Sequence, residues 1–227
     1  MELPPLDLAA SDTVRTFKMR RSRVSATQAD AIARLWSSYG LRVEPRPLDL
    51  PALFGREAPV LLEIGAGMGE ATFATARDHP ELDVLAVDVH TPGHGNLLRL
   101  VGDAGLTNLR VADGDALVLL RDMVGSGSLA EVRVLFPDPW PKSRHHKRRL
   151  VTRAFAALVH DRLAPGGVLH VATDWQEYAE VVRDVLGQSP LRVVETGARL
   201  RGRPVTRFEE QGLRAGRCPL DVVAARD

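Results

Sequence analysis

The sequence has little or nothing of what marks a secreted or membrane-bound protein. Its single cysteine, Cys218, cannot form a disulfide within the chain. No apolar run approaches the roughly 18 residues that a membrane span needs. The first residues, M-E-L-P-P-L-D, have neither the basic nor the apolar region of a signal peptide. We therefore expect a soluble, cytoplasmic protein without a membrane partner.

An excess of charge is also missing, because the net charge is only +1, and this value by itself identifies no partner. The positive charges are nevertheless unevenly distributed. Two short segments hold ten of the 30 lysines and arginines, which leaves the rest of the chain net acidic. One cluster alone is typical of a solvated surface, but two favour RNA binding. The first contains Arg15, Lys18, Arg20, Arg21 and Arg23, and the second contains Lys142, Arg144, Lys147, Arg148 and Arg149.

The length of the chain, 227 residues, is enough for one sizeable core and is small for two. We expect residues 1–24 to form a basic, flexible N-terminal segment and residues 25–227 to form a single domain. A helix is predicted at the start of this domain. Its N-terminus, S-A-T-Q from Ser25 to Gln28, has capping-box spacing, and its apolar face consists of Ile32, Leu35, Trp36 and Tyr39.

From Pro59 onward, short apolar runs alternate with amphipathic segments of helical length. The apolar runs are P-V-L-L-E-I-G, V-L-A-V-D-V, L-R-V-A-D, V-R-V-L-F, V-L-H-V-A-T-D, L-R-V-V-E and D-V-V-A-A. This alternation predicts a doubly wound α/β sheet, in which buried parallel strands read as nearly continuous apolar runs. Ligands of such sheets bind outside the carboxyl ends of the strands. Functional side chains are therefore expected just after each run.

Acidic residues follow the first three predicted strands. Glu63 ends the first, Asp88 ends the second, and Asp113 and Asp115 follow the third. Each of them alone is equally compatible with the N-cap of the next helix. Their common position at strand ends makes them candidates for a ligand site.

A glycine-rich loop, E-I-G-A-G-M-G-E, follows the first strand and contains Gly65, Gly67 and Gly69. It differs from a dinucleotide-binding fingerprint, because Glu70 stands where the third glycine would be and would repel the pyrophosphate of NAD. The loop therefore disfavours a dehydrogenase. It favours a ligand without phosphates that carries a nucleoside and an amino-acid group, with Asp88 accepting two hydrogen bonds from ribose hydroxyls.

Together, E-I-G-A-G-M-G and V-D-V resemble the S-adenosylmethionine site of a class I, Rossmann-like methyltransferase. Further motifs resemble the tRNA (guanine-N7)-methyltransferase family: F-P-D-P-W-P-K-S-R-H-H-K-R-R, D-W-Q-E-Y, T-R-F-E, T-P-G-H-G-N-L-L and N-L-R-V-A-D-G-D-A. The first of these motifs, from Phe136 to Arg149, is the most specific. The resemblance runs from about residue 13 to the C-terminus, and it implies a mostly parallel seven-stranded sheet with one antiparallel strand.

The resemblance implies a cytoplasmic enzyme that transfers a methyl group from S-adenosylmethionine to N7 of the variable-loop guanine, position 46 of tRNA, without a metal ion. The implied cofactor site is Glu63, Gly65, Gly67, Asp88, Asp115 and Asp138, and Asp138 is also the implied catalytic residue. The implied substrate site is Lys142, Asp174, Thr206, Arg207, Phe208 and Glu209. The family usually has Glu at the position of Asp88 and commonly Asn at that of Asp115, and both replacements keep a hydrogen-bond acceptor.

The cationic segment after Asp138 is interpreted as a contact for tRNA phosphates. Its two histidines are adjacent rather than at metal-ligand spacing, so no metal site is expected. The predicted RNA contacts are Arg144, His145, His146, Lys147, Arg148 and Arg149, with Arg20, Arg21 and Arg23 from the first cluster.

Asp138 lies in a proline-rich turn that follows the predicted strand ending at Phe136. If that strand lies beside the first one, Asp138 faces the methyl group of the cofactor; the structural alternative is an Asx-type turn with a packed tryptophan. Guanine N7 carries a lone pair and no proton, so its methylation needs no general base. Asp138 would stabilise the cationic product, or accept hydrogen bonds from guanine N1–H and the exocyclic amine. The sequence leaves both roles open.

Two other functions also stay open. The chain could be a methyltransferase for another RNA position or for an exocyclic amine, or a catalytically silent tRNA-binding protein. The sequence does not distinguish a monomer from a homodimer.

Overall fold

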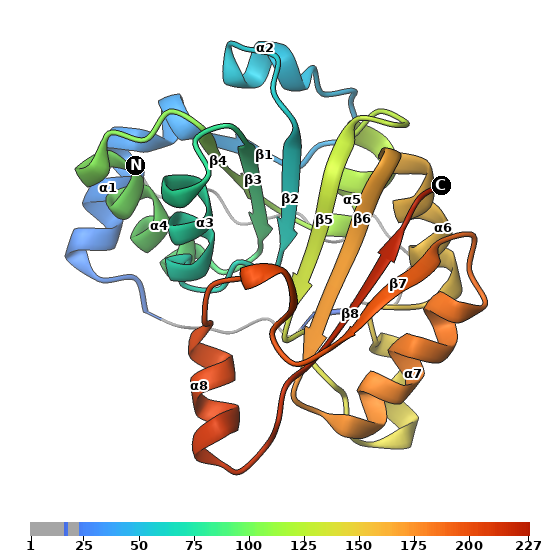
Figure 1. The fold of residues 1–227 in the computed structure, drawn as a ribbon. Coiled ribbons are helices and arrows are strands. Elements are labelled where there is room, and N and C mark those ends of the chain that lie inside the picture. The colour runs from blue at the N-terminus through green and yellow to red at the C-terminus, as the bar shows by residue number, and fades with distance from the viewer. Residues whose placement is uncertain (1–15, 18–22) are drawn as a thin grey trace.

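The computed structural model describes residues 16–17 and 23–227 (Figure 1). Most of the N-terminal segment 1–24, including Arg20 and Arg21, lies outside the described residues, and so does its predicted flexibility. The described residues form a central sheet with helices on both faces (Figure 1). This is the layered arrangement that alternating strands and helices predict.

The sheet contains eight strands within the described part of the chain, in the order β1-β4-β3-β2-β5-β6-β8-β7. β8 runs antiparallel to both of its neighbours, whereas the other pairs are parallel. The predicted doubly wound, mostly parallel sheet with one antiparallel strand is therefore confirmed. The strands are β1 Gly40–Arg42, β2 Val60–Ile64, β3 Asp83–Asp88, β4 Leu109–Asp113, β5 Leu129–Leu135, β6 Leu163–Thr173, β7 Arg192–Gly197 and β8 Leu220–Ala225.

The sheet has one strand more than the seven that were expected. The additional strand, β1, has three residues and pairs with the edge of β4, with Gly40 opposite Val111. It directly follows a helix that ends at Tyr39, and a Cβ on Gly40 would lie 2.3 Å from the ring of Trp36. A strand of three residues is too short to show an alternating pattern, so it could not be predicted from the sequence.

Helices cover both faces of the sheet and divide the core in two. α1, α3 and α4 pack on one face around Leu61 and Val84, and α5, α6 and α7 pack on the other around Leu62 and Leu85. The predicted capping box of α1 is present, with Ser25 and Gln28 each accepting a hydrogen bond from the backbone N–H of the other. The helices are α1 Ala26–Tyr39, α2 Leu50–Phe54, α3 Glu70–Asp78, α4 Thr91–Ala104, α5 Ala116–Val118, α6 Arg153–Arg162, α7 Gln176–Gly187 and α8 Arg207–Arg214.

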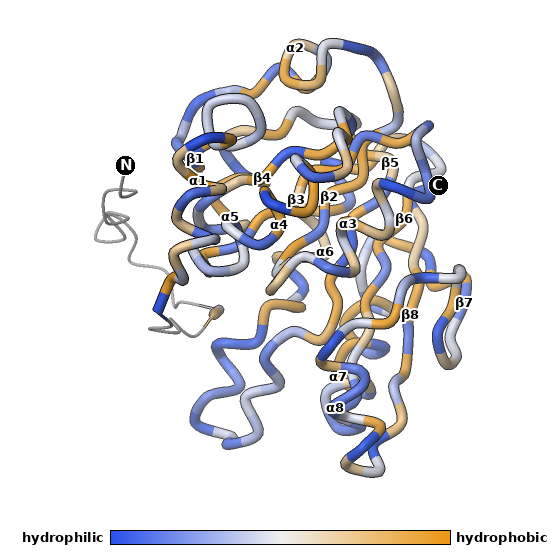
Figure 2. The backbone as a smooth tube through the Cα atoms, turned by 90° about the vertical axis from the view of Figure 1, so that its left-hand side faces the viewer, coloured by the Kyte–Doolittle hydropathy of each residue, from blue (hydrophilic) through white to orange (hydrophobic). Residues whose placement is uncertain are grey.

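The central strands are buried on both sides, and hydrophobic residues predominate along them (Figure 2). Every residue of β2 is buried, as expected for a parallel strand that is covered on both faces. None of the helices in the described part of the chain combines the length and apolarity needed to cross a membrane.

Candidate active site

The carboxyl ends of β2, β3, β4 and β5 surround a cavity of about 160 Å³. β2 pairs with β3 on one side and with β5 on the other, so the loops that follow these strands meet at one edge of the sheet. The structure thus brings together predicted cofactor residues from four loops. Those that line this first cavity are Gly65, Gly67, Asp88, Asp115 and Asp138.

The glycine-rich loop between β2 and α3 has backbone conformations that favour glycine. The φ angle is 81° at Gly65, 61° at Gly67 and 83° at Gly69, all in the left-handed region. α4 packs directly against this loop, because a Cβ on Gly93 would lie 1.7 Å from the carbonyl oxygen of Gly67. α4 therefore supports the loop on one side. A ligand on the other side would contact the backbone of the loop.

Asp88, at the end of β3, holds the same loop in place. Its Oδ2 accepts a hydrogen bond from Gly67 N at 2.8 Å, and its Oδ1 accepts bonds from Val89 N and His90 N at 2.6 and 3.1 Å. A carboxylate has about four acceptor positions, so roughly one remains on Oδ2. Asp88 can thus bind one ribose hydroxyl without rearrangement, rather than the two expected from the sequence.

The two acids after β4 have different positions. Asp115 lines the first cavity and also caps α5 by accepting a hydrogen bond from Leu117 N at 2.8 Å. Asp113 is buried instead, 3.5 Å from Arg42 and 3.8 Å from His94. Burial raises the pKa of Asp113, against the effect of these two neighbours. Among the described residues, no three His, Cys, Asp or Glu side chains are grouped so that they could hold a metal ion.

Glu63 lies in a second cavity, of about 430 Å³, which shares Gly65 and Gly67 with the first. Its carboxyl group is buried, and its Oε2 has no hydrogen-bond partner among the residues that the structure describes. Burial raises the pKa of Glu63, although Arg133 opposes the shift. A buried carboxylate without a partner is costly unless a cationic group pairs with it. The site therefore fits a ligand with an ammonium group, which S-adenosylmethionine carries at its amino-acid end.

The loop that holds Asp138 is strained at both ends. Phe136 and Trp140 have φ angles of 53° and 46°, in a region that residues other than glycine rarely adopt. Pro137 and Pro139 restrict the backbone on either side of Asp138. The pairing of β5 with β2 confirms the strand arrangement on which the prediction for Asp138 depended.

The cationic segment folds back over this loop. The guanidinium carbon of Arg148 lies 3.9 Å from the centroid of the Trp140 ring, and the ring of His145 meets Trp140 edge-on at 5.8 Å. Arg148 also donates a hydrogen bond to the carbonyl of Phe17, and Trp140 donates one to that of Thr16. The 3-10 helix formed by Ser143–Arg148 therefore contacts Phe17, a residue that lines the first cavity.

Arg149 differs from the rest of the cationic segment because it is buried. Its Nε donates to the carbonyl oxygen of Pro139 at 2.9 Å, and its Nη1 donates to Glu177 at 3.0 Å. Its guanidinium carbon also lies 4.9 Å from the centroid of the Tyr178 ring. Arg149 thus braces the Asp138 loop from inside, a position that does not suit the predicted contact with tRNA. The exposed cations of the segment are Lys142, Arg144 and Lys147.

The T-R-F-E motif begins α8 and has two faces. Thr206 caps the helix by accepting a hydrogen bond from Glu209 N at 3.1 Å. Thr206, Arg207 and Phe208 line the second cavity. Glu209 points into the protein instead, where its carboxylate binds Arg203 at 2.6 Å. The motif therefore supplies a wall of the cavity and, through Glu209, an internal anchor.

Asp174 anchors the C-terminal half of α8. Its Oδ2 accepts a hydrogen bond from Arg217 at 2.8 Å, and a Cβ on Gly212 would lie 2.4 Å from the same oxygen. Neither Asp174 nor Lys142 lines either of the two cavities. Their predicted role in substrate binding therefore stays a prediction.

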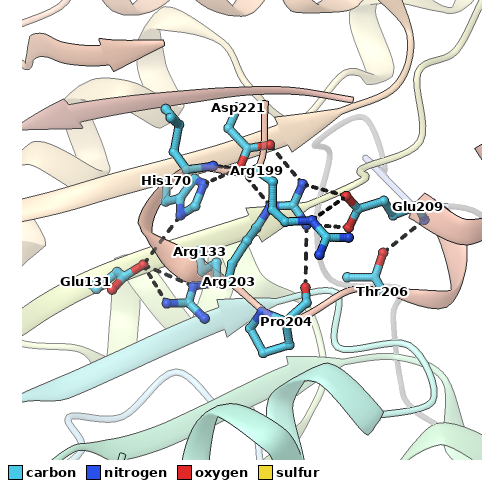
Figure 3. Close-up of polar contacts among 10 residues, drawn as sticks. Glu131, Arg133, His170, Arg199, Arg203, Pro204, Thr206, Glu209 and Asp221 are labelled. Carbon is cyan, nitrogen blue, oxygen red and sulfur yellow. Dashed lines mark hydrogen bonds and ion pairs between the residues drawn. The ribbon is translucent and has the colours of Figure 1, made fainter. Parts of the chain in front are cut away.

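A buried network of charged side chains connects α8 to the sheet (Figure 3). Arg203 donates to Asp221 at 2.7 and 2.9 Å as well as to Glu209, and Asp221 Oδ2 lies 3.0 Å from His170 Nε2. Burial lowers the pKa of His170, but the carboxylates of Asp221 and Glu131 outweigh this effect and raise it. Sequence reasoning missed His170 and Asp221, because single polar positions within apolar strands carry no motif.

Comparisons with known proteins identify the family. A family model described as "Putative methyltransferase" matches residues 57–220. The tRNA (guanine-N(7)-)-methyltransferase of Streptomyces avermitilis is 53% identical over 94% of this chain and 75% of its own length. That of Nitrosomonas europaea is 44% identical over 96% of this chain and 99% of its own.

Solved structures support the same fold. The 16S rRNA methyltransferase KamB matches with a TM-score of 0.58 at 17% identity, over 80% of this chain and 95% of its own. An antibiotic-related methyltransferase matches with a TM-score of 0.57 at 15% identity, over 80% and 96% of the two chains. These identities are low, so the two structures establish the class I methyltransferase fold alone. The family model and the sequence relatives show that the chain belongs to the tRNA (guanine-N7)-methyltransferase family.

Proposed function

We propose that this chain transfers the methyl group of S-adenosylmethionine to N7 of a guanine in tRNA, at position 46 in the variable loop. Membership of the family supports the reaction and the substrate. A cytoplasmic location follows from the same substrate. The observation that carries the proposal is the position of Asp138, which lines one cavity with the glycine-rich loop and with Asp88.

The residues of the two cavities suit the two ends of the methyl donor. Asp88 and Asp115 line the first cavity and offer acceptors to the ribose and the base. Glu63 lines the second cavity with a buried carboxylate whose Oε2 has no hydrogen-bond partner among the described residues. When bound, S-adenosylmethionine supplies a methyl group on a positively charged sulfur. Asp138 would lie near that methyl group, in the loop that follows β5, the strand paired with β2.

The chemistry needs positioning more than proton transfer. A bond forms between guanine N7 and the methyl carbon while the bond from that carbon to sulfur breaks, so the positive charge moves to the purine. N7 loses no proton, and no general base is needed. We propose that Asp138 accepts hydrogen bonds from the guanine and that its negative charge stabilises the developing cation. The strained, proline-restricted loop fixes the carboxylate before the substrate arrives.

The exposed cations next to this loop suit a polyanion. Lys142, Arg144 and Lys147 are exposed on the segment that follows Asp138. Phosphates bound there would bring a base of the same RNA to the cavity rim. We therefore propose that tRNA approaches over the 3-10 helix.

Methyl transfer from labelled S-adenosylmethionine to an unmodified tRNA transcript tests the function. Borohydride and aniline treatment then cuts the RNA at 7-methylguanosine, and we expect a single cut in the variable loop. Labelled RNA that resists cleavage would indicate another position or an exocyclic amine. Binding of tRNA without any labelling would indicate a catalytically silent protein. Either result would overturn the proposal.

A further inference from the structure

A row of buried polar side chains crosses the centre of the sheet. Arg133 of β5 lies opposite Glu63 of β2 on one side and opposite His170 of β6 on the other. All three are buried, and their neighbours along the strands are apolar. Charged groups in such surroundings are costly without partners. Each charge of this row must therefore be balanced by another group inside the protein.

His170 lies between two carboxylates (Figure 3). Its Nε2 is 3.0 Å from Asp221 Oδ2, and its Nδ1 is 3.8 Å from Glu131 Oε1. The first distance is that of a hydrogen bond, and the second is that of an ion pair. A neutral imidazole has a hydrogen on only one ring nitrogen, so its other nitrogen would direct a lone pair at a carboxylate. The geometry therefore favours the imidazolium form, in which both ring nitrogens carry a hydrogen.

The charged groups that face His170 determine when it holds this proton. The nearest guanidinium groups, Arg133 and Arg203, pair with the same two carboxylates, Glu131 and Asp221. Burial by itself lowers the pKa of His170, but the two carboxylates raise it above its usual value of about 6.5. Because the folded pKa is the higher one, the imidazolium and its contacts are present at low pH and are lost as the pH rises through the folded value.

Arg203 connects Asp221 to the candidate active site. Both carboxylate oxygens of Asp221 accept hydrogen bonds from Arg203, at 2.7 and 2.9 Å. The same guanidinium lies 5.3 Å from the centroid of the Phe136 ring and donates to Glu209 of α8 at 2.6 Å. Phe136 lines the first cavity together with Asp138. The orientation of Asp221 therefore bears on both the loop of Asp138 and the inner side of α8.

We propose that His170 is a positioning residue for methyl transfer, which in its protonated form fixes Asp221 and, through Arg203, the loop of Asp138 and helix α8. His170 lines neither cavity, so it acts through these residues rather than on the methyl donor or the guanine. Methylation at N7 needs no general base, so the chemical step itself requires no titrating catalytic group. The inference rests on the proposed function, and it predicts that methyl transfer slows when His170 loses its proton.

The pH dependence of single-turnover methylation tests this role. Labelled S-adenosylmethionine and unmodified tRNA are present at saturating concentrations, so the rate reports the chemical step. We expect the wild-type rate to fall roughly 10- to 100-fold as the pH rises, as for misplaced reacting groups, with a midpoint above about 6.5. His170→Gln has no proton to lose at this position. Its rate should be low and independent of pH, whereas a merely structural role would lower its melting temperature and leave the wild-type pH profile unchanged.

A surface histidine provides the matched control. His79 is exposed and pairs with Glu81, far along the chain from the network. His79→Gln should therefore keep both the rate and the pH profile of the wild type. An alkaline loss of rate that persists in His170→Gln, or a wild-type rate that does not fall with pH, would overturn the inference.

A second measurement needs neither catalysis nor a variant that folds. NMR spectra of the wild type without ligands give the titration of the His170 ring and the amide signals of Asp138 and of Phe208, which lines both cavities. We expect both amide signals to shift with the midpoint of His170. Amide signals that do not follow His170 would overturn the inference even if tRNA is methylated. If tRNA is not methylated at any pH, the proposed function fails, and the NMR midpoints alone decide the role of His170.

Discussion

The guanidinium of Arg203 lies 5.3 Å from the centroid of the Phe136 ring, at the start of the loop that carries Asp138. The same guanidinium hydrogen-bonds Asp221 in β8 and Glu209 in α8. The loop of Asp138 and the helix that lines the second cavity therefore share one buried anchor. Asp221 extends this anchor into the sheet.

Removing this anchor should cost much of the stability of the protein. Arg203→Met removes the guanidinium that two buried carboxylates share and leaves Glu209 with Arg199 and Asp221 with His170. We expect it to lower the free energy of unfolding by roughly 3–5 kcal/mol. Arg192→Met is the control, because Arg192 pairs with Asp227 at the surface with side chains 61% and 69% exposed. That change should cost less than about 1 kcal/mol. Urea unfolding of the two variants compares these losses, and equal losses would contradict a dominant role of the buried network.

The charge of Asp138 should matter more for turnover than for cofactor binding. Asp138→Asn keeps an acceptor oxygen but removes the negative charge, so we expect turnover to fall about 100-fold or more while the affinity for S-adenosylhomocysteine changes less than about threefold. Single-turnover methylation and isothermal titration measure the two effects. If turnover stays within about threefold of the wild type, the charge of Asp138 has no catalytic role.

The cationic segment should divide into residues that bind phosphates and one that supports the loop. Arg144→Gln and Lys147→Gln each remove an exposed charge, and each should reduce the salt dependence of tRNA binding by roughly 0.7–0.9 in the slope of log K against log salt. Arg149→Gln should leave this slope unchanged but lower the melting temperature, because it breaks contacts to Pro139 and Glu177. Fluorescence anisotropy at several salt concentrations gives the slopes. A reduced slope for Arg149→Gln would place Arg149 at the RNA.

Glu63 should lower the stability of the cofactor-free protein as the pH rises. Burial raises its pKa in the folded state, so the folded protein holds the proton more tightly than the unfolded chain does. Stability is therefore lost as the pH rises from the unfolded pKa, about 4.3, through the raised folded value. Glu63→Gln lacks this loss, and we expect its melting temperature to exceed that of the wild type at pH 8 but not at pH 4. A constant difference between the two proteins would contradict the titration of Glu63.

The sequence predicted the parts of the site that depend on short stretches of chain. The glycine-rich loop, the acids at strand ends and the proline-rich turn around Asp138 could all be recognised, because the strand that precedes each of them is apolar and continuous. Their meeting in one cavity also followed, since parallel strands place their carboxyl ends at one edge. The short strand Gly40–Arg42 gave no periodic signal.

The sequence by itself determined the alternation of strands and helices from β2 to β6, the family, and which loops meet at one edge of the sheet. Tertiary structure alone decided which charged side chains face inward. Arg149 and Glu209 belong to motifs that suggested contact with substrate, yet both are buried and paired with distant residues. Burial of a charge requires a partner of opposite sign in the folded protein. Such partners, like Arg203 and Asp221, are brought together by the packing of separate elements, which no local pattern in the chain records.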